Sequence, residues 1–513
     1  MSARGGLWQW LVLALPLASF LPWLGTPPLF DVDEGAFAEA TREMFERGDF
    51  LFTYLNGSPR FDKPILSYWL QALFVALLGP NEWAFRMPSA LAACAWSWAV
   101  WQFAKTYFSE DTANLALAIT ATAIGPFLIG RAATADALLN LWLALACFDA
   151  WRHVNGGGKA PLRRCYLWVG LGLLTKGPVA ALIPIAVTLM YALSTRTSAS
   201  IKIWLAAIRD PVGWLILLAV AAPWYGFAWQ RHGMDFIRGF LLHHNLSRFS
   251  GPLEGHGGGL FYYLIVIPLL LMPWSGLLVP TLARLRHDLR DALTRFLWLW
   301  VGFVFVFFTL SGTKLPHYAL YGTTPLFLLL ARRTNAHHGL WSLVTLALPA
   351  LWLLVLALLP SIITVLTAQV SGYYQAQFAR AAHQLAPGYY PMTLGALAVY
   401  LVIANRKAWP IGRRLAGGAA LSSLTLAAVV APWIGDVLQG PVKTAGLRAR
   451  LQPAVLWNFG APSFSVYRQA VTPVRPPQPG ELALTRSDRL DAEALRQVEI
   501  VYQAGGVVLV RRR

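Results

Sequence analysis

The stretch FDVDEGAFAEATREMFERGDFLFTYLNGSPRFDKP, residues 30–64, is strongly acidic although it lies between apolar segments. It holds seven Asp or Glu residues between Asp31 and Asp49 and an eighth at Asp62, after an Asn-Gly turn. Carboxylates next to membrane-type segments are costly unless they face water or take part in chemistry. The window therefore predicts a loop outside a membrane, with candidate functional acids in it.

The rest of the chain has the composition of a membrane protein. Hydrophobic residues make up 57% of the 513 residues, charged residues make up 13%, and there are 23 Trp. Repeated apolar runs predict a mainly α, polytopic integral membrane protein with about 13 transmembrane helices. The predicted segments are 7–24, 84–105, 112–130, 134–151, 165–178, 179–194, 210–229, 259–283, 295–311, 318–331, 339–360, 389–405 and 414–433.

The formal net charge of +18 is distributed in a pattern that excludes nucleic-acid binding as its explanation. Basic residues gather in alternate loops, namely 152–164, 196–209, 284–295, 332–333 and 406–414. This alternation follows the positive-inside rule and predicts that these loops and a retained N-terminal helix face the cytoplasm. The acidic window, the loop at 230–258, the turn at 311–317 and the C-terminal tail are then expected outside. Three cysteines without metal-binding spacing indicate no disulfide framework.

Two regions are expected. Residues 1–433 form the transmembrane region, with a first external loop at 25–83. The composition changes after residue 433. Residues 434–513 are therefore expected to form a small external α/β domain, with strands at 481–485, 498–502 and 507–510. The last two strands flank Gly505-Gly506 and are expected to form a hairpin.

The acidic window itself predicts a helix on the membrane surface. Asp31 and Glu34 have the spacing of a capping box. An apolar stripe at helical spacing, Phe37, Ala40, Met44 and Phe45, would face the protein. The acids Glu39, Glu43 and Glu46 would lie on the wet face, where Glu39 can pair with Arg42 and Glu43 with Arg47. Residues 65–78 are apolar but short, which favours an interfacial or re-entrant helix.

The predicted topology places one set of polar residues on the same side of the membrane. The set is Asp33, Glu34, Asp62, Lys63, Asp136, Lys176, His243, Arg248, Lys314, His317 and Tyr318. Acids and fixed cations at one membrane face suit a reaction on a lipid-linked phosphate, because Lys and Arg hold phosphate. A carboxylate can then act as a base or stabilise positive charge at a sugar carbon.

Each member of this set also has a purely structural interpretation. Acids in a first helical turn, such as Asp33 and Glu34, complement the helix dipole. Asp136 could pair with Arg131, Lys176 could snorkel to the interface, and Lys314 could cap the preceding helix. The joint placement favours the functional interpretation.

Several motifs, in order, resemble the GT-C polyprenyl-phosphate-sugar transferases, the family 39 group that includes protein O-mannosyltransferases and the bacterial lipid A aminoarabinose transferase. They are Asp33-Glu34, residues 38–44 ending at Gly48-Asp49, Asn56-Gly57, Lys63-Pro64 with Tyr68-Trp69, residues 86–89, residues 174–178 and residues 314–318. The resemblance covers roughly residues 7–433. It implies a GT-C fold with a small periplasmic C-terminal domain.

The resemblance also implies roles for individual residues. Asp33 matches a catalytic acid supported by Glu34, and Asp136 matches a second acid near the sugar. Lys63, Arg248, Lys314 and Tyr318 match the grip on the donor phosphate, with Lys176 and His317 nearby. Asp62 and His243 match a pair that holds a divalent metal, zinc or manganese, and no organic cofactor is implied. The chain departs from the family at Asp62, where Glu is usual, and at Ala36-Phe37, where close relatives have Arg-Tyr.

The function implied is transfer of a sugar, such as 4-amino-4-deoxy-L-arabinose, from undecaprenyl phosphate to lipid A or another periplasmic acceptor, with inversion. The enzyme is expected in the bacterial inner membrane, in contact with membrane lipids, with its active site in the periplasm. A protein or cell-wall glycan glycosyltransferase of the same fold is the alternative enzyme. A lipid-linked sugar flippase is the non-enzyme alternative, and it predicts charges at mid-membrane depth.

Overall fold

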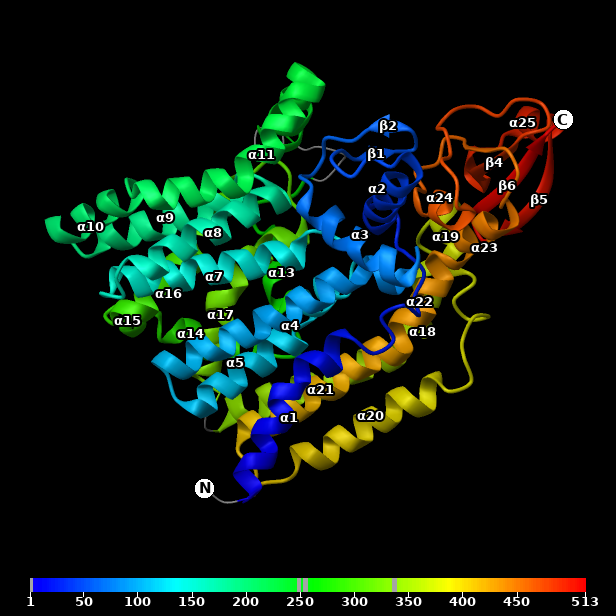
Figure 1. The fold of residues 1–513 in the computed structure, drawn as a ribbon. Coiled ribbons are helices and arrows are strands. Elements are labelled where there is room, and N and C mark those ends of the chain that lie inside the picture. Colours follow the sequence, from blue (N-terminus) through cyan, green and yellow to red (C-terminus); the bar gives the residue numbers. More distant parts are fainter. Residues whose placement is uncertain (1–2, 247–250, 252–256, 335–338) are drawn as a thin grey trace.

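The computed structural model describes residues 3–246, 251, 257–334 and 339–513, and helices dominate it (Figure 1). Up to residue 236 the helices are α1 (Ala3–Phe20), α2 (Asp33–Arg47), α3 (Leu66–Leu78), α4 (Glu82–Tyr107), α5 (Glu110–Thr122), α6 (Ile124–Gly130), α7 (Asp136–Val154), α8 (Lys159–Lys176), α9 (Val179–Ser194), α10 (Ser198–Ile208) and α11 (Pro211–Phe236). The later ones are η1 (Ile237–Leu246), α13 (Tyr262–Leu270), η2 (Ser275–Leu277), α14 (Leu278–Ala283), α15 (Leu285–Asp288), α16 (Ala292–Leu310), η3 (Pro316–Gly322), α17 (Thr323–Ala331), α18 (Leu340–Thr367), α19 (Gly372–Phe378), α20 (Tyr389–Ala404), α21 (Ile411–Thr425), η4 (Leu426–Val430), α22 (Ala431–Leu438), α23 (Gly440–Arg448), α24 (Ser463–Arg468), η5 (Ser487–Arg489) and α25 (Ala492–Arg496).

The mainly α architecture is confirmed, whereas the count of about thirteen membrane helices stays a prediction. Within the described residues, four helices are long and apolar enough to cross a membrane, and α5 with α6 adds a fifth if their 57° bend lies within one span. The predicted single segments 112–130 and 259–283 are both broken in the structure. Pro126 lies in the first turn of α6 and Pro273 follows α13, and proline cannot continue the hydrogen-bond ladder of a helix.

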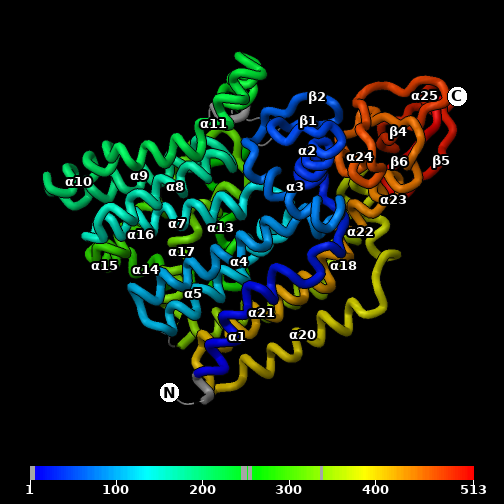
Figure 2. The backbone as a smooth tube through the Cα atoms, viewed as in Figure 1, coloured from blue at the N-terminus to red at the C-terminus, as the bar shows by residue number. Residues whose placement is uncertain are grey.

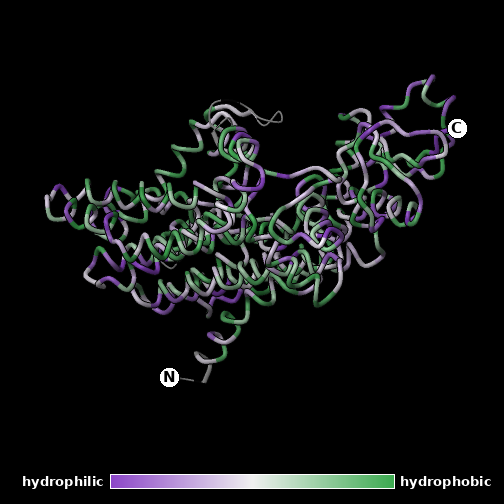
Figure 3. Tube along the Cα trace, turned by 45° about the horizontal axis from the view of Figure 1, so that its top comes forward, coloured by the Kyte–Doolittle hydropathy of each residue, from purple (hydrophilic) through white to green (hydrophobic). Residues whose placement is uncertain are grey.

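The core lies where α4, α5, α7 and α17 pack together. Alanine and glycine let these helices approach closely, as where Gly130 meets Ala93. Trp96 fills the centre and donates a hydrogen bond to Oγ1 of Thr324 at 2.9 Å. Figure 3 shows hydrophobic residues along most of the long helices and hydrophilic ones towards the helix ends and the C-terminus. The packed bundle forms the scaffold on which the polar end of the molecule rests.

The predicted helix in the acidic window is α2, and the predicted short helix after it is α3. Between them β1 (Tyr54–Leu55) and β2 (Ser58–Pro59) form a small antiparallel hairpin around the Asn-Gly turn. The predicted ion pairs within α2 are present, with Arg42 on Glu39 at 2.7 Å and Arg47 on Glu43 at 3.3 Å.

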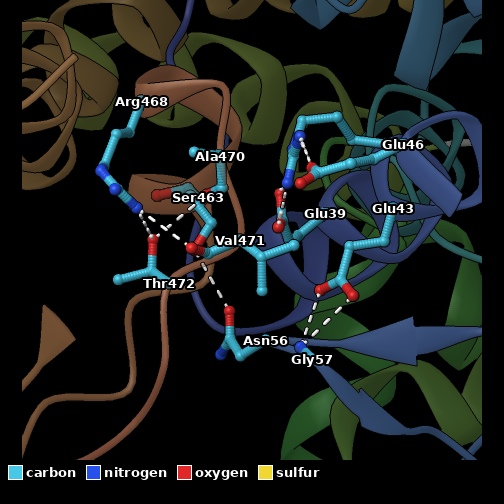
Figure 4. Close-up of polar contacts among 12 residues, drawn as sticks. Glu39, Glu43, Glu46, Asn56, Gly57, Ser463, Arg468, Ala470, Val471 and Thr472 are labelled. Carbon is cyan, nitrogen blue, oxygen red and sulfur yellow. Dashed lines mark hydrogen bonds and ion pairs between the residues drawn. The ribbon is translucent and has the colours of Figure 1, made fainter. Parts of the chain in front are cut away.

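The expectation that the acids of α2 form a wet face is wrong for two of the three. Glu39 and Glu43 are fully buried, while Glu46 is exposed. Phe45, expected on the buried stripe, is also exposed. Beside Glu39 the chain adds a second layer, because α24, from the far end of the chain, packs on α2. Glu43 instead lies against the β1–β2 hairpin, where the backbone nitrogen of Gly57 donates to both of its carboxylate oxygens (Figure 4).

The C-terminal part contains a four-stranded sheet with the order β3-β4-β6-β5, formed by β3 (Ala454–Leu456), β4 (Leu482–Arg486), β5 (Val498–Ala504) and β6 (Val507–Arg512). The predicted hairpin is β5–β6, which pair antiparallel, while β3 runs parallel to β4. The strand β3 and the helix α24 were not predicted. The domain boundary predicted at residue 433 falls inside α22, and it stays a prediction.

The α2 helix and the C-terminal sheet lie at one end of the molecule, away from the N-terminus and α10 (Figures 1 and 2). The contact between α2 and α24 is close at Gly35, where an added Cβ would lie 2.6 Å from the backbone nitrogen of Ser463. The side chains of Asn56 and Ser465 also meet at 3.1 Å. The last hundred residues therefore help to hold the segment around α2 in place.

Candidate active site

Three neighbouring acids at the start of α2, Asp31, Asp33 and Glu34, differ in their hydrogen-bond partners. Asp31 accepts hydrogen bonds from the backbone nitrogen of Ser463 at 2.9 Å and from its Oγ at 2.5 Å. Helix α2 starts at Asp33, and its N-cap, Val32, makes no side-chain cap bond, so the predicted capping box of Asp31 and Glu34 is wrong. Partial burial against α24 raises the pKa of Asp31 to about 7.

Glu34 is buried and bound on both carboxylate oxygens. Arg86 contacts Oε1 at 2.8 Å and Oε2 at 2.7 Å, and the backbone nitrogen of Ala133 donates to Oε1 at 2.7 Å. Arg86 also donates to the carbonyl oxygens of Leu24, Pro27 and Pro28, and so ties the loop before α2 to α4. These fixed donors give Glu34 a positioning role for the neighbouring Asp33.

Asp33 is exposed, and none of the described residues hydrogen-bonds to its carboxylate. Its position at the start of α2 follows from the anchors on either side, Asp31 on α24 and Glu34 on Arg86. A carboxylate held in place by its backbone, with no hydrogen-bond donor among the described residues, can accept a hydrogen bond from a ligand. Asp33 is therefore the acid of the acidic window that is best placed to react.

Asp136 begins α7 and is buried among groups from two other elements. Its Oδ1 accepts a hydrogen bond from Nζ of Lys176 at 2.6 Å and from the hydroxyl of Tyr321 at 3.0 Å. Nε2 of His317 lies 3.9 Å from the same oxygen. The predicted pairing of Asp136 with Arg131 is wrong, because Arg131 donates to the carbonyls of Ser19 and Phe20 instead.

Asp62 and Lys63 form a third group, at the end of the β1–β2 hairpin. Nζ of Lys63 contacts Oδ1 of Asp62 at 2.5 Å, and Nη2 of Arg60 contacts Oδ2 at 3.0 Å. The guanidinium of Arg60 lies 5.2 Å from the centre of the Phe37 ring. Arg60 was not among the predicted site residues.

One cavity of about 520 Å³ brings the three groups together. Six predicted residues line it, namely Asp33, Asp62, Lys63, Asp136, Lys176 and His317, together with Phe37, Thr134, Ala135 and Leu315. A second cavity of about 1040 Å³ shares Asp33, Thr134, Asp136 and His317 and is otherwise lined mostly by apolar residues of the loop before α2 and of α6. A polar cavity thus adjoins a larger, largely apolar one, and the two share Asp33 and Asp136.

Other predicted residues lie outside this cavity. Lys314 donates to the carbonyl of Ser311, the C-cap of α16, so its predicted capping role is confirmed. The Tyr318 ring is buried, with Nζ of Lys176 5.8 Å from its centre. His243 lies on η1, and Arg248 falls outside the described residues.

Tyr321 is a site residue that sequence reasoning missed, although its signal was present. Residues three apart in a 3₁₀ turn share a face, so Tyr318 and Tyr321 were equivalent candidates. The resemblance pointed to Tyr318 because it ends the matching motif at residues 314–318.

Metal ligation has weak support in the described part of the chain. It contains no group of three His, Cys, Asp or Glu side chains that could hold an ion. Asp62, the predicted carboxylate ligand, already contacts two cations. The predicted metal stays a prediction.

Comparison with known proteins confirms the resemblance that the motifs indicated. A family model described as dolichyl-phosphate-mannose-protein mannosyltransferase matches residues 62–226. The chain is 29% identical over 341 residues to an undecaprenyl phosphate-alpha-4-amino-4-deoxy-L-arabinose arabinosyl transferase of Pseudomonas aeruginosa (strain UCBPP-PA14), a match that spans 64% of this chain and 59% of the relative. A transferase of the same name from Serratia proteamaculans is 28% identical over 343 residues, covering 64% and 60% of the two chains.

Among solved structures, the chain is similar to the crystal structure of ArnT from Cupriavidus metallidurans bound to undecaprenyl phosphate. The TM-score is 0.80 at 20% sequence identity, over 99% of this chain and 98% of that one. The apo structure of the same protein matches equally, with a TM-score of 0.80. This likeness shows the GT-C fold and, with the apolar helices, a multi-pass membrane protein.

Proposed function

We propose that this chain is a glycosyltransferase that moves a sugar from undecaprenyl phosphate to an acceptor at the outer face of a bacterial inner membrane. The observation that carries the proposal is the shared boundary of the two cavities, with Asp33 and Asp136 on both. A polyprenyl-linked sugar needs such an arrangement, because its headgroup is polar and its tail is apolar.

The cations at this boundary suit the phosphate of the donor. Lys63 lines the polar cavity and is held there by Asp62. Lys176 lines it too and is fixed by Asp136. Ammonium groups oriented in this way stabilise the negative charge that grows on a phosphate as it departs.

The proposed reaction is a single inverting displacement. The acceptor oxygen forms a bond to the anomeric carbon as the bond from that carbon to the phosphate oxygen breaks, and the electron pair leaves with undecaprenyl phosphate. If the acceptor is a hydroxyl, Asp33 takes its proton. If the acceptor is a phosphate of lipid A, no proton needs to move, and Asp33 stabilises positive charge at the sugar.

The similarity to aminoarabinosyl transferases supports 4-amino-4-deoxy-L-arabinose as the sugar and lipid A as the acceptor. The alternative is protein mannosylation, which the description of the matching family model favours. The flippase alternative is less well supported, since the acids and cations cluster at one end of the bundle rather than along a path through it.

The same end of the bundle supports a periplasmic active site. The acidic window and the C-terminal sheet gather there, while the N-terminus lies away from them (Figure 2). The basic loops predicted to be cytoplasmic, such as 152–164, connect the opposite ends of α7 and α8. The proposed orientation therefore has the N-terminus in the cytoplasm and the donor site in the periplasm.

Asp33→Asn tests the proposal directly. In cells that depend on this chain, mass spectrometry should show that the added sugar on lipid A falls by about a hundredfold or more, because loss of a fixed charge that stabilises the transition state lowers a rate by roughly 10² to 10³. Asp49→Asn is the matched control at the other end of α2, where Asp49 caps a turn through Leu51 and Phe52. It should leave the sugar at its normal level. Unchanged lipid A with altered glycoproteins would favour protein mannosylation.

A further inference from the structure

We propose that Arg60 takes the place beside Asp62 that a divalent metal would otherwise occupy, and that this chain positions Lys63 without a metal. The inference rests on the proposed function for the role of Lys63 at the donor phosphate. Arg60 is not among the site residues predicted from the sequence. Because Arg60 does not line the polar cavity, the inference makes it a positioning residue.

The Asp62 carboxylate is already neutralised from two sides. Lys63 approaches Oδ1 at 2.5 Å and Arg60 approaches Oδ2 at 3.0 Å. A divalent metal ion on the same carboxylate would place two further positive charges close to the charges of Lys63 and Arg60. Like charges at this separation repel strongly in a partly buried site. The two cations on the Asp62 carboxylate therefore disfavour a divalent cation there.

Arg60 is built into the site rather than resting on its surface. The side chain of Arg60 is 10% exposed. The backbone nitrogen of Arg60 donates to the carbonyl of Thr53 at 2.8 Å, and Oγ1 of Thr53 donates to the carbonyl of Arg60 at 2.9 Å. The Phe37 ring, which lines the cavity, lies against the guanidinium. The fork of Arg60 is thus fixed by the hairpin behind the cavity wall.

Fold stability alone does not explain this buried charge. Nη1 of Arg60 is buried and has no hydrogen-bond acceptor in the described part of the chain. A buried donor without a partner destabilises a fold. The arrangement is explained if the charge serves the site, where a guanidinium stays protonated at all working pH values and, unlike a metal, cannot dissociate.

Metal measurements on the full-length purified protein form the first test. Elemental analysis should find well below one zinc or manganese per chain, and added zinc chloride or manganese chloride should not raise the melting temperature. Transfer should stay within about twofold after treatment with EDTA. One bound zinc or manganese per chain, or a loss of transfer that the metal restores, would overturn the inference.

Variants of Arg60 form the second test, with undecaprenyl phosphate itself as the probe. Arg60→Gln should weaken its binding about tenfold or more, since Lys63 loses its fixed neighbour, and Arg60→Lys should restore binding to within about threefold. Arg47→Gln is the matched control, because Arg47 also stacks on a ring of the hairpin, 4.1 Å from the centre of Tyr54, yet lies outside the cavity.

The control should bind undecaprenyl phosphate within about twofold of the natural protein. Equal binding by Arg60→Gln and Arg47→Gln would contradict the positioning role. If the natural protein binds no undecaprenyl phosphate, the proposed function fails. The metal content and melting temperature would then still decide the inference.

Discussion

The two ends of α7 each carry a buried aspartate, and the two carboxylates are bound in different ways. At the start of the helix, Asp136 receives Lys176 and Tyr321 on the same oxygen, Oδ1. Near its end, Asp149 receives Arg152 and Arg164 on Oδ1 and Arg164 and Trp168 on Oδ2. Among the described residues, no donor binds Oδ2 of Asp136, whereas Asp149 has both oxygens occupied.

The surroundings of the two acids differ in the same sense. Asp136 lines the polar cavity with Asp33 and Lys63. At the other end, a cavity of about 910 Å³ is lined almost entirely by apolar side chains, and Asp149 is not among its lining residues. An acid with a spare oxygen in a polar cavity is suited to chemistry, and an acid with four donors is suited to holding helices together.

Asp136→Asn should have the largest effect on transfer. Loss of the charge removes the partner that orients Lys176 and the negative oxygen facing the cavity, so we expect a fall of about a hundredfold or more in kcat/KM per folded molecule. A transfer assay on detergent-purified protein measures it, with size-exclusion chromatography reporting the folded fraction. Transfer within threefold of normal would remove Asp136 from the reaction.

Asp149→Asn should act on stability instead. Two arginines and an indole lose a charged acceptor, which costs about 1–3 kcal/mol because Arg164 is half-exposed and partly rehydrates. Thermal unfolding followed by fluorescence should show a melting temperature lower by several degrees, with transfer per folded molecule unchanged. A loss of transfer at a normal melting temperature would show that Asp149, like Asp136, acts in transfer rather than in stability.

Tyr321→Phe should have an intermediate effect, because it removes a hydroxyl that donates to Asp136 and leaves Lys176 in place. A lost hydrogen bond to a charged group corresponds to about a tenfold lower kcat/KM. Tyr318→Phe is the companion variant, since the sequence favoured Tyr318 and the structure favours Tyr321. A larger loss from Tyr318→Phe would show that Tyr318, rather than Tyr321, is the tyrosine that acts at the site.

The smallest effect concerns Asp31, whose burial should make the stability of the fold depend on pH. Its pKa is raised to about 7 in the fold, above the ordinary value of 3.8, so the protonated form favours the folded state. The protonated, partly buried carboxyl therefore stabilises the fold at low pH, and this contribution is lost as the pH rises through about 7, although the hydrogen bonds from Ser463 favour the ionised form. Between pH 5.5 and 8 the melting temperature should fall by about 1–2 °C more in the natural protein than in Asp31→Asn. Equal slopes would show that Asp31 does not titrate in this range.

Much of the fold could be predicted because its signals are local. Apolar runs located the helices, α2 and α3 followed from length and spacing, and Gly505-Gly506 marked the hairpin of β5 and β6. The breaks in the 112–130 and 259–283 segments were missed, although their prolines are visible in the sequence. Hydropathy averaged over a segment does not register a single missing hydrogen bond.

The sequence predicted which residues gather at the candidate site better than it predicted the hydrogen bonds between them. Six of its members do line one cavity, because topology alone brings them to the same end. The partners were harder to predict. Arg131 is near Asp136 in sequence but reaches α1, while Lys176 and Tyr321 reach Asp136 from 40 and 185 residues away. The cover on α2 also comes from α24, which no local pattern connects to it.

The tie between the first loop and α24 also constrains how the molecule is made. Asp31 finds its partner Ser463 432 residues further along the chain, and the backbone nitrogen of Leu29 finds the hydroxyl of Tyr467 438 residues further. Because synthesis runs from the N-terminus, α2 emerges from the ribosome long before the segment that covers it. Its buried acids therefore gain their cover only after more than four hundred further residues have been made. The order of synthesis thus makes the first turn of α2 one of the last parts of the site to reach its final surroundings.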